Sequence, residues 1–130
     1  MKIDQLKTLA KNVSQNSYSP FSKFKVGSAI LTKNGDVFTG CNMESKSLTF
    51  NICAERNAIS TAISKAGNLE IDQVVIYTPT QKAATPCGPC RQLIFEFGGN
   101  ANVYSFCDSD DSIEMNIKEL LPQAFDFDEQ

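Results

Sequence analysis

The sequence has no histidine and no tryptophan, and acidic residues outnumber basic ones, with 15 Asp and Glu against 12 Lys and Arg. Without histidine, no imidazole can bind a metal or transfer a proton, so both tasks would fall to thiols, carboxylates and backbone groups. The net charge of −3 argues against a nucleic-acid partner, which favours a basic surface. The first 20 residues contain no apolar run, so we expect no signal peptide, no membrane partner and a cytoplasmic location.

Length and cysteine content indicate one reduced globular domain. A chain of 130 residues with 42% hydrophobic residues can bury a core of its own, so we expect a single catalytic domain over residues 1–130. Five cysteines are an odd number, and three of them stand in metal-binding spacing. Disulfides are therefore not expected, and a metal is.

The hydrophobic pattern predicts a mixed sheet covered by helices, an α/β fold. Helices are expected at 3–17, 53–66, 87–97 and 116–121, and strands at 26–32, 37–41, 74–77, 103–107 and 112–115. Asn34-Gly35 predicts a tight hairpin turn between the first two strands. The order of elements combines strands joined by hairpins with strands joined through helices.

Two short segments carry the residues that point to chemistry, and each stands at the start of a predicted helix. The first reads Cys-Ala-Glu-Arg at 53–56, and the second reads Pro-Cys-Gly-Pro-Cys at 86–90. Three thiolates leave one open position on a tetrahedral zinc, which distinguishes a catalytic zinc site from a closed structural one. Water at that position would have its pKa lowered toward ~7, and Glu55 is close enough in sequence to carry protons.

Helix geometry restricts how these side chains can meet. Residues two apart on a regular helix point about 200° from one another, so Cys53 and Glu55 face one metal only if Cys53 lies at the non-helical boundary. Cys87 and Cys90 are three apart and share one face of a first helical turn, where Pro89 is tolerated. All three thiolates would then lie near positive helix ends.

Two other interpretations of the cysteines remain open at this point. Cys87 and Cys90 form the C-x-x-C pattern of a thiol-redox module, although that interpretation leaves Cys53 and Glu55 without a role. A structural zinc site with four cysteines would need Cys41 or Cys107 as its fourth ligand. Both of these are otherwise expected to be small buried residues at strand ends.

These motifs together resemble the small homotetrameric type of cytidine deaminase. The likeness extends over residues 18–26, the Gly-Cys-Asn-Met-Glu run at 40–44, both zinc segments and the tail at 120–125. It implies a three-layer α/β/α fold with a five-stranded mixed sheet and one Zn²⁺ per chain held by Cys53, Cys87 and Cys90. It also implies hydrolytic deamination of cytidine and deoxycytidine for pyrimidine salvage, with Glu55 as the proton carrier.

The resemblance also implies roles for residues whose default interpretation is structural. Phe24 would line the pyrimidine pocket, and Phe125 would reach the site of a neighbouring subunit in a homotetramer. The remaining implied contacts are Asn42 and Glu44 with the ribose 3′-hydroxyl, the Ala54 N–H with the 2-oxo group, and Arg56 with the metal-bound sulfurs.

The chain departs from the family pattern directly after Glu44. It reads Ser-Lys-Ser-Leu at 45–48, where relatives usually carry Asn, small residues and a Tyr. The 5′ side of the sugar pocket is therefore expected to differ. The alternative substrates are modified aminopyrimidine nucleosides, such as N4-substituted cytidines or blasticidin S. Deaminases acting on blasticidin usually lack the arginine found here as Arg56, which favours cytidine.

Overall fold

Five strands form one mixed sheet in the computed structural model, which describes residues 1–127. The strands are β1 (Gly27–Thr32), β2 (Val37–Cys41), β3 (Ile71–Tyr77), β4 (Asn102–Phe106) and β5 (Ser112–Asn116), in the order β2-β1-β3-β4-β5. β3 and β4 run parallel, and the other neighbours pair antiparallel. This confirms the predicted five-stranded mixed sheet. The last three residues of the predicted domain 1–130 lie outside the described residues.

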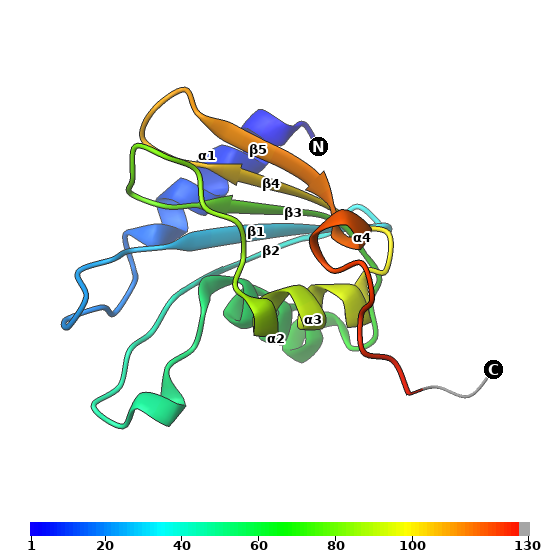
Figure 1. Ribbon diagram of the computed structural model, residues 1–130, viewed down its shortest axis with the longest axis horizontal. Helices are drawn as coiled ribbons and strands as arrows, with labels where there is room; N and C mark the ends of the chain where they lie inside the picture. The colour runs from blue at the N-terminus through cyan, green and yellow to red at the C-terminus, as the bar shows by residue number, and fades with distance from the viewer. Residues whose placement is uncertain (128–130) are drawn as a thin grey trace.

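Helices cover both faces of the sheet, which confirms the predicted three layers (Figure 1). Helix α1 (Ile3–Ser14) lies on one face, and α2 (Ala54–Ala66) and α3 (Gly88–Phe97) lie on the other. A short 3₁₀ turn, η1 (Leu48–Phe50), interrupts the loop before α2, and α4 (Ile117–Leu120) follows β5. None of the helices within residues 1–127 is long and apolar enough to cross a membrane.

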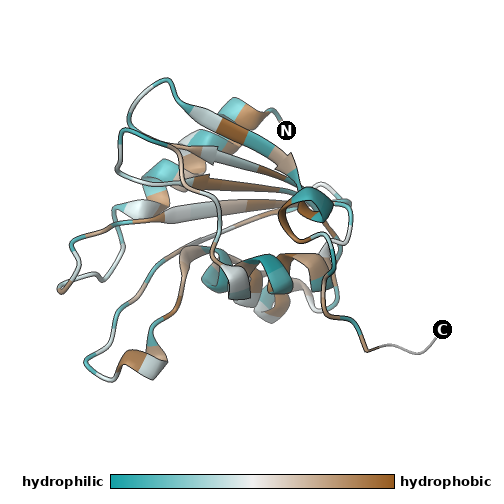
Figure 2. Cartoon of the chain, in the orientation of Figure 1, coloured by the Kyte–Doolittle hydropathy of each residue, from teal (hydrophilic) through white to brown (hydrophobic). Residues whose placement is uncertain are grey.

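Alternation along the strands builds a separate core on each face of the sheet. Ala29 and Leu31 of β1 pack toward α1 with Leu6, whereas Ile30 between them packs toward α2 with Ile59. Successive strand residues point to opposite faces, so a strand buried on both sides must be apolar at nearly every position. The central strand β3 is accordingly among the most hydrophobic segments of the chain (Figure 2).

A glycine lets α2 lie directly on the edge strand β2. A Cβ atom at Gly40 would stand 2.3 Å from the backbone nitrogen of Ala58, closer than two such atoms can approach. The missing side chain therefore permits backbone contact between strand and helix. This contact sets the position of α2, whose N-terminus carries Ala54 and Glu55.

Two predicted boundaries differ from those observed. Helix α1 ends at Ser14 rather than 17, because the Gln15 N–H donates to the Asn12 carbonyl and the Asn16 N–H to the Val13 carbonyl, which closes the last turn there. β3 begins at Ile71 rather than 74. Its first residues pair with β1 and β4 despite the polar side chains of Asp72 and Gln73, so sheet pairing overrides the local pattern.

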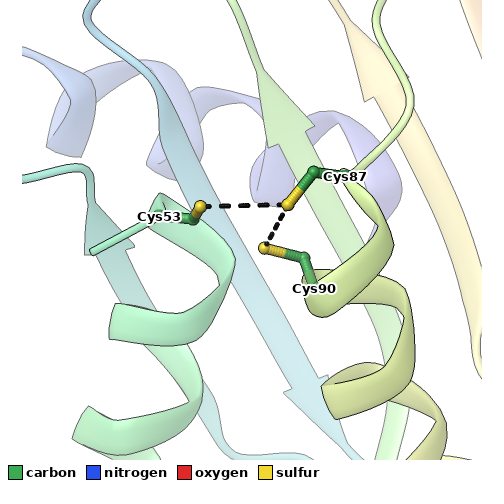
Figure 3. Close-up of side chains that lie close together, drawn as sticks. All are labelled: Cys53, Cys87 and Cys90. Atoms are coloured by element: carbon green, nitrogen blue, oxygen red, sulfur yellow. Dashed lines mark hydrogen bonds between the residues drawn. The ribbon is translucent and has the colours of Figure 1, made fainter. Parts of the chain in front are cut away.

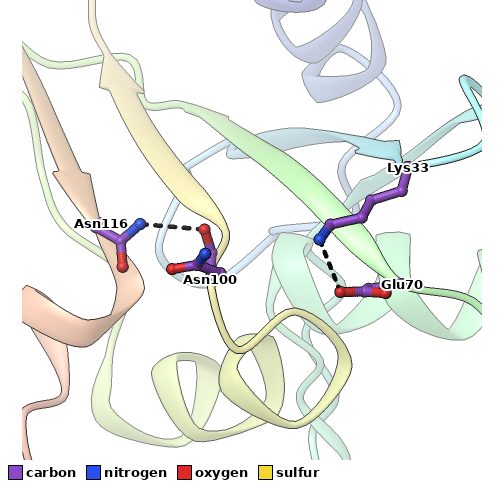
Figure 4. Close-up of polar contacts among 4 residues, drawn as sticks. All are labelled: Lys33, Glu70, Asn100 and Asn116. Atoms are coloured by element: carbon purple, nitrogen blue, oxygen red, sulfur yellow. Dashed lines mark hydrogen bonds and ion pairs between the residues drawn. The ribbon is translucent and has the colours of Figure 1, made fainter.

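Polar contacts fasten the end of the sheet where β3 and β4 begin (Figure 4). The Lys33 ammonium lies 2.9 Å from the Glu70 carboxylate, and the Asn116 side-chain amide donates to the Asn100 carbonyl at 3.1 Å. The ion pair is solvent-exposed, so it contributes little stability. The candidate site lies at the opposite end of the sheet, where β3 ends.

Candidate active site

The start of α2 brings Cys53 and Glu55 to the same side. Cys53 is the residue before the helix, with extended angles φ −74° and ψ 155°, and Glu55 lies in the first turn. The predicted non-helical position of Cys53 is confirmed. Because its backbone is extended, the divergence expected for two helical residues does not apply. The Glu55 side chain is only 6% exposed.

The start of α3 brings the other two thiols to the same place (Figure 3). Cys87 precedes the helix in an extended conformation, Pro89 occupies the first turn, and Cys90 is fully buried. The Cys87 and Cys90 sulfurs are 3.3 Å apart, and the Cys53 and Cys87 sulfurs are 4.0 Å apart. All three sulfur atoms lie within 4.8 Å of one another, at the N-termini of two helices.

The surroundings shift the pKa values of Cys53, Cys90 and Glu55, lowering the first and raising the other two. The pKa of Cys53 is lowered to about 6, chiefly by interaction with the Cys90 thiol and further by the positive charge of Arg56. The pKa of Cys90 is raised by the same interaction and by burial. Burial raises the pKa of Glu55 to about 7, and the negative charge of Cys53 adds to this. A carboxyl group with that pKa both accepts and returns protons near neutral pH.

The three thiols suit a zinc ion. Thiolates are soft ligands that favour zinc among the common divalent metals, and three of them leave one tetrahedral position for another ligand. Within residues 1–127, no other group of three His, Cys, Asp or Glu side chains comes close enough to hold a metal. Cys41 and Cys107 lie outside the cluster, so the four-cysteine alternative finds no fourth ligand.

A pocket of about 270 Å³ opens beside the thiol cluster. Cys53, Ala54, Glu55 and Cys87 line it together with Phe24, Asn42 and Glu44, as do Ile76 and Thr78 at the end of β3. The structure thus brings six predicted site residues from the first half of the chain to one cavity, together with Cys87, which directly precedes α3. The lining is mostly apolar with a few polar groups, which is typical of small-ligand sites.

Asn42 and Glu44, two polar residues that line the pocket, also hold the loop that carries Phe24. The Asn42 Oδ1 accepts from the Val26 N–H at 2.9 Å and from the Ser17 hydroxyl, and its Nδ2 donates to the Phe24 carbonyl at 2.7 Å. The Glu44 carboxylate accepts from the Phe21 and Ser22 backbone N–H groups and from the Ser22 hydroxyl. These bonds lower the pKa of Glu44, the Ser22 hydroxyl contributing most.

Phe125 does not line this pocket. The residue is 68% exposed, and its ring is tilted by 33° to that of Phe127, with centroids 5.7 Å apart. The Gln92 side-chain amide holds the Phe125 backbone from both sides, donating to its carbonyl at 2.8 Å and accepting from its N–H at 3.2 Å.

Several pocket residues were missed by sequence reasoning. Thr78 follows β3 directly, and Thr85 belongs to the irregular segment before Cys87. The carboxyl end of a central parallel strand is a common place for ligand binding, and this signal would have pointed to Thr78. Arg91, which lies outside the pocket but bonds Thr85 and Pro86, was also missed, because these contacts are not visible in the sequence around it.

Fold and site together define an α/β protein with a three-cysteine metal centre at two helix N-termini beside a small-ligand pocket. Comparison with known proteins makes this specific. Residues 1–106 match the cytidine and deoxycytidylate deaminase zinc-binding region. The chain belongs to the cytidine and deoxycytidylate deaminase family.

Individual relatives are similar to this chain over most of its length. A cytidine deaminase of Sporosarcina psychrophila is 36% identical over 126 residues, covering 96% of this chain and 92% of the relative. The cytidine deaminase of Mycoplasma pneumoniae is 38% identical, with 88% and 87% covered. The crystal structure of cytidine deaminase from Burkholderia pseudomallei superposes with a TM-score of 0.91 at 34% identity, covering 96% of this chain and 100% of that one. This membership leaves no support for the thiol-redox alternative.

Proposed function

We propose that this chain is a zinc-dependent cytidine deaminase, which hydrolyses cytidine and deoxycytidine to uridine and deoxyuridine with release of ammonia in pyrimidine salvage. The observation that carries the proposal is the convergence of Cys53, Cys87 and Cys90 with the buried Glu55 on one pocket. Two cytidine deaminases that are 36% and 38% identical to this chain support the same reaction. We take residues 1–130 as one catalytic domain of a cytoplasmic protein.

Each protein group has a task in this reaction. Cys53, Cys87 and Cys90 would hold one zinc ion, which when bound supplies a Lewis acid that activates water for attack at C4. The Glu55 carboxylate accepts the proton of that water and returns it to ring N3. It then accepts the second proton from the new C4 hydroxyl and delivers it to the C4 amino group, so that the C4=O bond forms as the C4–N bond breaks and ammonia leaves. In this scheme the Arg56 guanidinium offsets the negative charge of the thiolates.

The pocket residues would orient the substrate. The Ala54 N–H, at the N-terminus of α2, is proposed to hold the pyrimidine 2-oxo group, and Phe24 to pack against the ring. Asn42 and Glu44 are proposed to bind the ribose 3′-hydroxyl. Among residues 1–127, the hydrogen bonds leave one Asn42 N–H and about one of the ~4 acceptor positions on Glu44 unused. One donor beside one acceptor complements a single hydroxyl group.

The direct test measures ammonia release from the zinc-loaded protein. Cytidine and deoxycytidine should both be turned over. Free cytosine should not, because it leaves Asn42 and Glu44 without their partner. Blasticidin S and an N4-substituted cytidine test the alternative substrates. Turnover of blasticidin S without turnover of cytidine would contradict the proposal.

We further propose that the active form is a homotetramer in which Phe125 covers the pyrimidine of a neighbouring subunit. Large apolar side chains are exposed on two loops and on the tail: Phe21, Leu48, Phe50, Phe125 and Phe127. Burying each one is worth roughly 1.5–3 kcal/mol, so contact between subunits would be favourable.

Phe125→Ala should raise KM for cytidine by roughly tenfold or more, because one buried ring is lost from the ligand contact. Zinc content should stay at the parent level, since the residue lies away from the thiols in its own subunit. Phe127→Ala is the matched control and should change KM little. Light scattering on the active protein tests the assembly, and a fully active monomer would rule out sites shared between subunits.

A further inference from the structure

Arg91 follows Cys90 directly on α3, and its side chain bonds two separate segments of the chain. Nε donates to the Pro86 carbonyl at 2.7 Å, and Nη2 donates to the Thr85 hydroxyl at 2.8 Å. Nη1 donates to the Leu120 carbonyl at the end of α4, at 2.9 Å. All three nitrogens of the guanidinium are therefore used within the chain.

Two of these bonds converge on the residues that lead into Cys87. Pro86 immediately precedes this ligand, and Thr85 lines the pocket beside it. The backbone N–H of Arg91 also donates to the Cys87 carbonyl at 3.0 Å. A single residue on α3 thus bonds residues 85, 86 and 87 in succession.

The segment that Arg91 holds has no regular structure of its own. Residues 78–87 connect β3 to α3 without helix or strand, so their path depends on anchors from elsewhere. The first part of the segment is held by the turn after β4. The Asp108 N–H donates to the Thr80 carbonyl at 2.7 Å, and the Asp111 carboxylate accepts from the Ala83 N–H at 2.9 Å. Arg91 holds the last part.

An arginine suits this position because its donors are fixed in one plane. A guanidinium reaches several acceptors at once with charge-assisted bonds, whereas a lysine ammonium is a single point on a flexible stem. The acceptors here are two carbonyls and a hydroxyl, none of them charged.

We propose that Arg91 is a positioning residue for the metal ligand Cys87. It holds residues 85–87 against α3, so that the Cys87 sulfur stays 3.3 Å from that of Cys90. Through Leu120 it ties the same segment to the part of the chain that continues to Phe125. This inference rests on the proposed zinc site, and it assigns a function to a residue outside the ligands and the substrate pocket.

The test follows zinc release from the full-length protein to a chromogenic chelator, 4-(2-pyridylazo)resorcinol. Arg91→Met keeps the unbranched stem of the side chain and removes its three bonds, so release should accelerate roughly tenfold. In the cobalt-substituted protein, the thiolate-to-cobalt charge-transfer bands should shift, because the Cys87 sulfur is no longer held in place. Asp111→Ala removes the bond to the Ala83 N–H, which holds the first part of the same irregular segment and not the part next to Cys87. It should leave both the release rate and the bands at parent values.

A milder variant keeps the test valid if Arg91→Met does not fold. Thr85→Val preserves the branched shape and removes one bond, so it should accelerate release roughly threefold. In the double variant, Thr85→Val should add nothing to the effect of Arg91→Met, because both remove the same contact. Equal release rates in the Arg91→Met and Asp111→Ala proteins, or an unchanged rate in Thr85→Val, would overturn the proposal. Absence of ammonia release by the parent protein would instead count against the proposed function, because zinc retention is measured without substrate.

Discussion

Glu55→Gln should lower kcat for cytidine by roughly 10²–10⁴-fold, the usual contribution of a general acid–base group. Glutamine has nearly the same shape, so the buried side chain still fits under the pocket, but it cannot accept and return a proton. The sequence contains no histidine that might take over this task. The loss can exceed this range, because the same carboxylate is proposed to act at more than one step.

The measurement combines steady-state ammonia release with metal analysis and circular dichroism. Zinc content and fold should match the parent protein, since Glu55 is not one of the three thiol ligands. Glu96→Gln makes the same chemical change at an exposed position of α3 and should leave kcat unaltered. A Glu55→Gln protein with near-parent kcat would remove this residue from the mechanism.

Cys90→Ala should abolish both zinc retention and activity. Alanine is chosen because serine could still offer an oxygen ligand. Only two thiols would remain, and Cys90 is the fully buried member of the three. The parent protein should contain one zinc per chain, with three sulfur neighbours and one lighter neighbour by X-ray absorption spectroscopy.

Cys107→Ala provides the matched control, because Cys107 is also buried but lies outside the thiol cluster. It should retain zinc and most of its activity. A four-sulfur shell in the parent protein would contradict the catalytic interpretation, since no position would be left for water. Full zinc content in Cys90→Ala would show that the ligand set is wrong.

Much of the fold was predictable because its strands and helices have strong local signals. The Asn34-Gly35 turn marked the hairpin between β1 and β2, and Gly67 marked the end of α2. The start of β3 was missed because Asp72 and Gln73 are polar, whereas Gln73 pairs with both neighbouring strands and Ile71 pairs with β1. That pairing involves residues distant in sequence and cannot be found in a local pattern.

The metal cluster was predictable for a different reason. Ligand spacing within one helical turn is a local property, and the non-helical position of Cys53 follows from requiring Glu55 to face the same way. The pocket wall at Thr78 and Thr85 depends on where β3 and the irregular segment come together, so spacing alone does not reveal it. The contacts of Arg91 reach Leu120, far along the chain, and likewise appear only in the folded structure.

The separation of the ligands along the chain has a thermodynamic consequence. Cys53 and Cys87 are 34 residues apart, and their sulfurs meet only when β1 and β3 have paired and both helices have packed on the sheet. An unfolded chain can offer at most the neighbouring pair Cys87 and Cys90, so a metal ion binds the native state far more tightly. By mass action, a metal at about 1,000 times its dissociation constant would add about 4 kcal/mol to the free energy of unfolding. The supply of zinc in the cell would thus set how much folded protein survives, as well as how much of it is active.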